Sequence, residues 1–176
     1  CHRIPGDHVG IHTHNDTEQA VAGSLAAVDA GARQIQGTLN GLGERCGNAN
    51  LCSIIPTLLL KEPYRSRYET RVTEEGLRDL GRISRMLDEI LNRSPDRHAP
   101  YVGSAAFAHT AGLHASAIAK DPSTYEHIEP ERVGNARVIP MSNQAGQSNL
   151  LRRLSEAGLS VAPDDPRLPA LLAEVK

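Results

Sequence analysis

Two short apolar segments near the start of the chain, each followed by a helical pattern, constrain its fold more than any other feature. Residues 9–14 (VGIHTH) and 33–40 (RQIQGTLN) have the length and composition of β-strands. Residues 17–31 carry apolar residues at helical spacing, and the apolar run 51–61 is also expected to be helical. Strands that alternate with helices predict a parallel α/β sheet, because parallel neighbours need a crossover between them.

The ends of the first helix and the later helices can be placed from local signals. Asn15 or Asp16 is expected to cap the first helix, with Gly31 as its stop. Residues 62–71 (EPYRSRYETR) are charged and break the pattern, which predicts a linker. Residues 73–91 predict one amphipathic helix. Its apolar face would consist of Leu77, Leu80, Ile83, Leu87 and Ile90. Further helices are expected within residues 148–159 and 169–176.

Composition and charge exclude several classes of function. The net charge of -2 gives no basic surface for binding nucleic acid, and aromatic residues, at 3%, are too few to stack on bases. The sequence therefore does not indicate a nucleic-acid-binding protein. There is no apolar run of membrane-spanning length and no secretory leader, so we expect no membrane contact. The three cysteines are too few and too irregular for a disulfide framework, which predicts reduced thiols in the cytoplasm. Cys46 and Cys52 are expected to be packing residues.

Two histidines stand at the end of the first predicted strand. Side chains alternate across a strand, so His12 and His14 share one face and Thr13 points away. Two imidazoles placed in this way can bind one divalent cation. The alternative is a pair of solvated histidines at a strand end, and an HxH motif alone does not decide between them.

The loop after the second predicted strand offers a third ligand. In parallel sheets the loops at the carboxyl ends of the strands converge, so residues 41–50 (GLGERCGNAN) would overhang the histidines. There Asn48 could donate its carbonyl oxygen to the metal, and the glycines would allow tight folding. Two imidazoles and a hard oxygen suit Mg²⁺, Mn²⁺, Co²⁺ or Zn²⁺. Glu44 and Arg45 are expected to form an ion pair that holds this loop.

Together these residues resemble a known family. HTHND, followed by QGTLNGLGERCGNANL, is similar to the α-isopropylmalate, homocitrate and citramalate synthases, metal-dependent Claisen-condensing enzymes related to 3-hydroxy-3-methylglutaryl-CoA lyase. The resemblance extends from about residue 9 to about residue 151, through PYVG, TYEHIEPERVGN and AGQSNLL. Within the family, these sequence motifs are most similar to those of the citramalate synthases.

The fold that the resemblance implies is a (β/α)8 TIM barrel followed by helical subdomains, which reach over the partner subunit's active site in a homodimer. On that pattern residues 1–61 contain the last two βα units, and residues 62–176 form a linker and the helical arm. A barrel needs about 250 residues. The 176-residue chain is therefore expected to be an α/β carboxyl-terminal fragment of the catalytic domain with its helical subdomains, inactive by itself and without a regulatory domain.

The family's roles carry over at five positions. His12, His14 and Asn48 match metal ligands, while an aspartate ligand belongs to the first barrel strand. His114, in TAGLHASA, matches an arm histidine implicated in acid–base catalysis, and Tyr125, eleven residues later, matches a nearby arm tyrosine. Without the resemblance these two would be interpreted as a helix-surface histidine and a half-buried anchor.

The sequence departs from the family at two places in the arm. Close relatives have HKGG where this chain has His109-Thr110-Ala111-Gly112, so a lysine contact is lost. Gln147 stands where an arginine is common. Neither departure touches the three predicted metal ligands.

The resemblance also implies the reaction. Pyruvate would bind a divalent metal, and the enolate of acetyl-CoA would attack its keto carbon, with thioester hydrolysis releasing CoA. This acyltransferase reaction serves branched-chain amino acid (isoleucine) biosynthesis. The alternatives are 2-isopropylmalate or homocitrate synthase, with bulkier keto acids, or an inactive dimerisation arm that keeps half a metal site.

Overall fold

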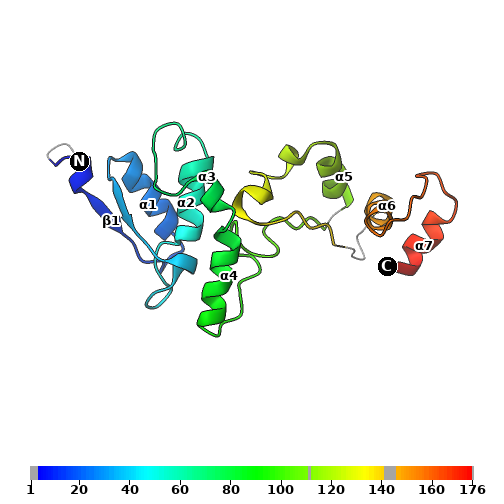
Figure 1. Cartoon of the computed structure of the whole chain (residues 1–176), viewed down its shortest axis with the longest axis horizontal. Helices are drawn as coiled ribbons and strands as arrows, with labels where there is room; N and C mark the ends of the chain where they lie inside the picture. Colours follow the sequence, from blue (N-terminus) through cyan, green and yellow to red (C-terminus); the bar gives the residue numbers. More distant parts are fainter. Residues whose placement is uncertain (1–3, 111, 141–145, 176) are drawn as a thin grey trace.

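The computed structural model describes residues 4–110, 112–140 and 146–175. In chain order its elements are η1 (Gly6–His8), β1 (Gly10–His12), α1 (Ala20–Asp29), β2 (Gln34–Gln36), η2 (Leu39–Gly41), α2 (Leu51–Leu60), α3 (Glu74–Leu77), α4 (Leu80–Ile90), α5 (Gly112–Lys120), η3 (Pro122–Thr124), η4 (Pro130–Val133), α6 (Gln147–Glu156) and α7 (Leu168–Val175). The two termini lie at opposite ends of an elongated molecule (Figure 1).

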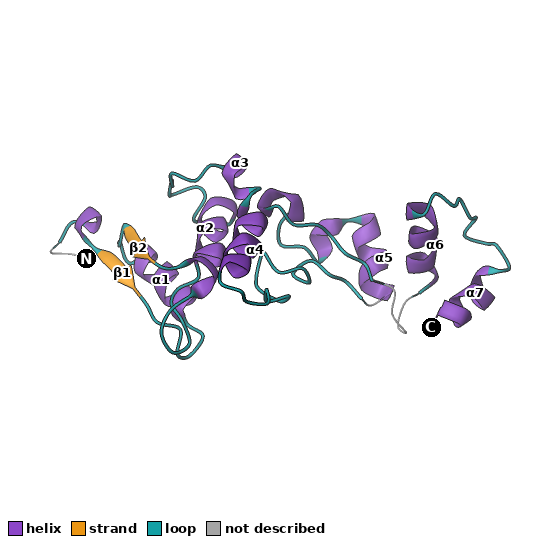
Figure 2. Ribbon diagram, turned by 60° about the horizontal axis from the view of Figure 1, so that its bottom comes forward, coloured by secondary structure: helices purple, strands orange, loops and turns teal. Residues whose placement is uncertain are grey.

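The predicted parallel sheet is present but short. β1 and β2 pair in parallel, with His12 opposite Gln36, and α1 forms the crossover between them (Figure 2). Each strand is only three residues long. Beyond the strands, residues 47–50 insert between the segments that continue β1 and β2. Ala49 N–H donates to Thr13 O, and Thr38 N–H donates to Ala49 O. The carboxyl ends of the strands are thereby held apart by the returning loop.

Helix α1 begins later than the sequence predicts. Glu18 has a left-handed φ of 59°, so the residues after Asp16 form a turn rather than a first helical turn. Asn15 still caps the helix from a distance, because its Oδ1 accepts a hydrogen bond from Ala20 N–H at 3.2 Å. Gly31 ends the helix with a φ of 109°, as predicted.

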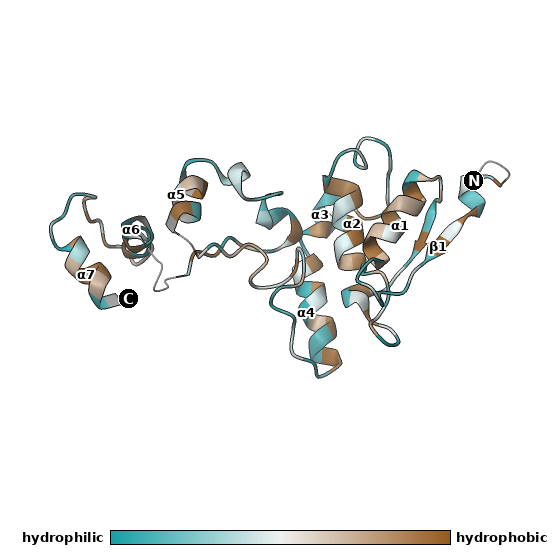
Figure 3. Cartoon of the chain, turned by 180° about the vertical axis from the view of Figure 1, so that it is seen from behind, coloured by the Kyte–Doolittle hydropathy of each residue, from teal (hydrophilic) through white to brown (hydrophobic). Residues whose placement is uncertain are grey.

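Helix α2 lies between two hydrophobic clusters. On one side Ile54 and Leu58 pack with Ala20 and Ala49 of the α/β part. On the other side its Cys52 and Leu60 belong to a larger cluster with Leu77, Leu80, Tyr101, Val102, Phe107, Ile128 and Val133. Strongly hydrophobic stretches lie on α1 and α2 (Figure 3). The apolar run 51–61 is thus a central helix that joins the sheet to the arm.

Residues 62–71, the predicted linker, are attached to the α/β part by two tyrosines. Tyr64 and Tyr68 stack with ring centroids 6.2 Å apart and pack against the α/β cluster. The Tyr64 hydroxyl donates to Asp29 Oδ2 at 3.0 Å, and the Tyr68 hydroxyl donates to Val28 O at 3.3 Å. Charged residues dominate the composition of this segment, but two aromatic rings decide where it lies.

The predicted single helix 73–91 is broken into α3 and α4. Thr73 caps α3 by accepting a hydrogen bond from Gly76 N–H. In α4 the buried face is formed by Leu80, Gly81, Ser84 and Asp88. Ile90, expected on the apolar face, is 68% exposed. The helix turns its small residues inward because the segment around Gly134 comes close. A Cβ on Gly81 would lie 2.9 Å from Gly134 O.

The carboxyl-terminal helices follow the prediction within a few residues. α6 and α7 correspond to the helices predicted at residues 148–159 and 169–176. α5 packs against both η3 and α6. Within the described ranges, every helix is too short or too polar to traverse a lipid bilayer. Cys52 is a packing residue as expected, but Cys46 is exposed in its loop, which corrects that expectation.

Candidate functional site

His12 and His14 lie on one face at the end of β1. Their ring centroids are 5.0 Å apart with the ring planes at 83°. Thr13 points the other way, toward α1, where its hydroxyl donates to Ala20 O at 2.9 Å and lies 3.0 Å from Ser24 Oγ. The alternation predicted for this segment therefore continues past the last residue of β1.

Asn48 is brought to the histidines by the backbone. His14 and Asn48 form an antiparallel bridge. It is supported on either side by hydrogen bonds from Asn15 N–H to Gly47 O at 2.8 Å and from Ala49 N–H to Thr13 O at 3.1 Å. The sequence suggested that this loop overhangs the histidines, but it does not. It turns back and pairs with the segment that carries them.

The amide oxygen of Asn48 is buried without a partner. Asn48 Nδ2 donates to Leu42 O at 3.1 Å, which fixes the orientation of the amide. Its Oδ1 accepts no hydrogen bond from any described residue. A buried acceptor without a donor is rare in folded proteins and is destabilising by about 1–3 kcal/mol. A cation is a natural partner for such an oxygen.

Glycine is required next to this amide. A Cβ on Gly43 would lie 2.5 Å from Asn48 Nδ2 and 3.0 Å from its Oδ1. A Cβ on Gly47, which has a φ of 89°, would lie 2.0 Å from Gly41 O. The glycines in this loop therefore let its backbone close over the asparagine.

The loop is tied to the first strand by Arg45, but not through the partner that the sequence suggested. Arg45 Nε and a terminal nitrogen donate to the two carboxylate oxygens of Asp16 at 2.7 and 2.9 Å. Glu44 is 3.8 Å from Arg45 and is 87% exposed. The hydrogen bond from Arg45 lowers the pKa of Asp16. The main ion pair therefore joins two segments rather than two adjacent residues.

The donor set fits a divalent cation. Among the described residues, no three His, Cys, Asp or Glu side chains gather as a metal site. The end of β1 instead brings together two imidazoles and Asn48, whose Oδ1 has no partner among the described residues. Nitrogen and oxygen donors of this kind suit Mg²⁺, Mn²⁺, Co²⁺ or Zn²⁺.

His114 and Tyr125 form a second pair, in the arm. Their ring centroids are 4.2 Å apart with an interplanar angle of 33°. His114 is on α5, and Tyr125 follows η3 and is 45% exposed. Helices α3 and α4 lie between α5 and β1 (Figure 1), so within one chain this pair does not join the two histidines and Asn48.

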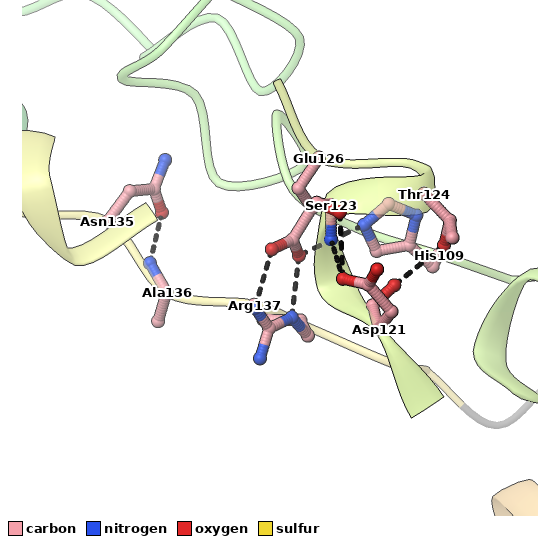
Figure 4. Close-up of polar contacts among 8 residues, drawn as sticks. All are labelled: His109, Asp121, Ser123, Thr124, Glu126, Asn135, Ala136 and Arg137. Carbon is pink, nitrogen blue, oxygen red and sulfur yellow. Dashed lines mark hydrogen bonds and ion pairs between the residues drawn. The ribbon is translucent and has the colours of Figure 1, made fainter. Parts of the chain in front are cut away.

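Sequence reasoning missed one polar cluster beside this pair. Glu126 forms a bidentate ion pair with Arg137, and His109 lies against the same carboxylate (Figure 4). These residues come from irregular segments, where no periodic spacing connects them. The only sequence signal is that each is polar in an otherwise apolar or turn-rich context.

Two family models match most of the chain. The model described as HMGL-like matches residues 2–83, and the model described as homocitrate synthase post-HMGL domain-like matches residues 101–176. The first match contains the predicted metal ligands and the second contains the arm pair. The match therefore extends over both candidate sites.

Several proteins of known name are similar over nearly the whole chain. The (R)-citramalate synthases of Aquifex aeolicus and Synechocystis are 51% and 50% identical over 99% and 96% of this chain. The 2-isopropylmalate synthase of Methylacidiphilum infernorum is 38% identical over 89%. The chain spans 30–32% of the length of these relatives. Residues 2–83 therefore belong to the HMGL-like family, and residues 101–176 to the homocitrate synthase post-HMGL domain-like family.

Proposed function

We propose that this chain is the carboxyl-side part of a citramalate synthase, a cytoplasmic acyltransferase that condenses acetyl-CoA with pyruvate in isoleucine biosynthesis. The (R)-citramalate synthases are more similar to it, at 43–51% identity, than the 2-isopropylmalate synthases, at 38–39%. Residues 9–61 would be the last two βα units of a TIM barrel, and the remainder the linker and helical arm.

The observation that carries this proposal is the unpartnered Oδ1 of Asn48 next to His12 and His14. These three residues would hold a divalent cation, Mg²⁺ or Mn²⁺ in preference to Zn²⁺ or Co²⁺. Such a cation supplies Lewis-acid polarisation of a keto carbonyl and a counter-charge for the oxyanion formed in the condensation. The Asp16–Arg45 ion pair would keep the ligand loop against the first strand while substrate enters.

His114 and Tyr125 would carry the proton steps. Imidazole has an ordinary pKa near neutrality, so it both accepts and returns a proton at working pH. The phenol of Tyr125 would orient the His114 ring and donate a hydrogen bond to a reacting oxygen. The position of α5 on the far side of α3 and α4 supports a homodimer in which this pair acts at the partner's metal site.

A thiol-release assay on the full-length protein tests the proposal. Acetyl-CoA would be supplied with pyruvate, with a bulkier branched 2-keto acid and with 2-ketoglutarate in separate reactions, each with and without EDTA. We expect pyruvate to give the highest kcat/KM and EDTA to abolish CoA release. Preference for the branched acid would indicate the isopropylmalate reaction, and chelator-insensitive turnover would exclude the metal role.

A further inference from the structure

A buried ionic cluster closes the base of the segment that carries His114 and Tyr125. We call residues 109–126 the arm loop, and His109, Glu126 and Arg137 the base cluster (Figure 4). Arg137 Nε and a terminal nitrogen donate to the two carboxylate oxygens of Glu126 at 2.6 and 2.5 Å. His109 Nε2 lies 3.4 Å from Glu126 Oε1, so the first and last residues of the arm loop meet.

The base cluster is held by paired backbone on one side. Ala108 and Val138 form a parallel bridge, with hydrogen bonds from His109 N–H to Val138 O and from Val138 N–H to Phe107 O. His109 and Arg137 therefore come from two segments that are fixed to each other. Glu126 is bound to both members of this pair at the far end of the arm loop.

Glu126 has little freedom in this position. Its side chain is 2% exposed, against 23% for Arg137 and 12% for His109. Burial raises the pKa of Glu126, but the hydrogen bonds and charge of Arg137 and the nearby His109 ring outweigh burial and lower it overall. The carboxylate therefore stays ionised, and a buried carboxylate that lost its arginine would be strongly destabilised.

Hydrogen bonds within the arm loop connect Glu126 to the segment that carries the His114 and Tyr125 rings. Asp121 accepts hydrogen bonds from Ser123 N–H and Oγ, and the N–H groups of Tyr125 and Glu126 both donate to Pro122 O. Tyr125 thus sits on a tight turn directly before the buried Glu126. Because α5 packs against η3, displacement of Glu126 would move the Tyr125 ring relative to His114.

We propose that the base cluster positions His114 and Tyr125 by closing both ends of the arm loop. The proposal rests on the proposed acid–base function of that pair. His109, Glu126 and Arg137 are positioning residues: they act through the placement of the two rings and do not themselves contact substrate.

Proton NMR of the 176-residue chain tests this without any assay of turnover. The nuclear Overhauser effect between the His114 and Tyr125 rings would be compared in the wild type, Glu126→Gln and Arg137→Lys. We expect the effect to be present in the wild type and lost in both variants. The exchange Glu126→Arg with Arg137→Glu restores opposite charges and should recover it at least in part. Retention of the wild-type effect in both single variants would overturn the proposal.

Two controls separate positioning from general unfolding. Asp165→Asn removes another bidentate ion pair with an arginine, Arg167, which is 82% exposed, and should leave the ring effect unchanged. The methyl signals of Ile54 in α2 report whether the α/β part remains folded, and they should not move in Glu126→Gln. Loss of the ring effect only together with the Ile54 signals would assign the cluster to global stability and refute the proposal.

The same variants in the full-length protein separate this inference from the proposed function. Glu126→Gln should lower kcat about 100-fold with KM changed less than about threefold, the cost of a small misplacement of catalytic groups. A wild-type protein that shows the ring effect but no condensation would refute the function alone. A variant that loses the ring effect but keeps normal kcat would refute the positioning role.

Discussion

His14 and Asn48 are direct partners in an antiparallel backbone bridge. Side chains of opposed residues in such a bridge lie on the same face, with Cβ atoms about 4.5–5.5 Å apart. His12 reaches this face by strand alternation, and its ring lies 5.0 Å from that of His14. The convergence of the three side chains is therefore a consequence of backbone pairing.

Replacing Asn48 with leucine should separate metal binding from stability. The leucine side chain has a similar size and removes the unpartnered oxygen, so the free energy of unfolding without metal should stay unchanged or rise by up to about 2 kcal/mol. Mn²⁺ affinity should fall at least about tenfold. Urea unfolding and Mn²⁺ titration of the chain measure the two effects.

Asn50 provides a matched control two residues away. Its side chain accepts a hydrogen bond from Cys52 N–H at 2.9 Å and so caps α2. Asn50→Ala should lower the free energy of unfolding by about 1 kcal/mol and leave Mn²⁺ affinity unchanged. If Asn48→Leu were the more destabilising of the two without metal, the account of the unpartnered oxygen would be wrong.

Adding one methyl group at Gly43 should weaken metal binding without removing a ligand. The new Cβ of Gly43→Ala would meet the Asn48 amide at 2.5 Å and displace it. Gly23→Ala is the control, because its Cβ meets nothing closer than 3.8 Å and it lies inside α1. That change should raise stability by up to about 1 kcal/mol with metal affinity unchanged. Equal metal affinity in the two variants would contradict the predicted contact.

Substitution of the arm pair should slow turnover rather than weaken substrate binding. His114→Gln and Tyr125→Phe in the full-length protein should each lower kcat by about 10²–10⁴-fold, the usual contribution of a proton-transfer group. His98→Gln changes an exposed histidine upstream of the arm loop and should have no effect. Steady-state kinetics with pyruvate measure this, and a rise in KM alone would argue against a proton-transfer role.

His127 should make the protein less stable in mild acid. Its ring lies 5.8 Å from that of Phe107, nearly parallel, and burial, followed by the charge of Lys61, lowers its pKa from the ordinary value of 6.5. The folded state thus binds fewer protons than the unfolded chain just below pH 6.5. The corresponding stability is full above that value and is lost as pH falls through the folded pKa.

The variant His127→Phe keeps an aromatic ring and removes the proton site. Its urea midpoint should fall less than that of the wild type between about pH 7.5 and about pH 5.5, the range in which histidines titrate. His98→Gln serves again as the exposed comparison. Identical pH dependence in the wild type and His127→Phe would show that this ring does not carry the effect.

The sequence predicted the features that depend on short-range patterns. Strand alternation placed His12 and His14 together, Gly31 ended α1 at the expected residue, and the parallel pairing of β1 with β2 followed from the crossover helix. The roles of His114 and Tyr125 came from family resemblance alone, and they stay predictions. So does the division of the chain at residue 61.

The errors arose where distant contacts override local composition. Tyr64 and Tyr68 attach a charged segment to α1, which no linker pattern reveals. The face of α4 is set by the close approach of Gly134 to Gly81, so helical periodicity placed Leu77 and Leu80 correctly but put the exposed Ile83 and Ile90 on the buried face. The base cluster joins residues from irregular segments, and only the folded chain brings them together.

An anomalous-scattering crystal structure of the protein soaked in Mn²⁺ tests the central claim most directly. We predict one peak within about 2.0–2.3 Å of an imidazole nitrogen of His12, an imidazole nitrogen of His14 and Oδ1 of Asn48. A peak bound elsewhere, or one that contacts the histidines while Asn48 Oδ1 remains without a partner, would contradict it.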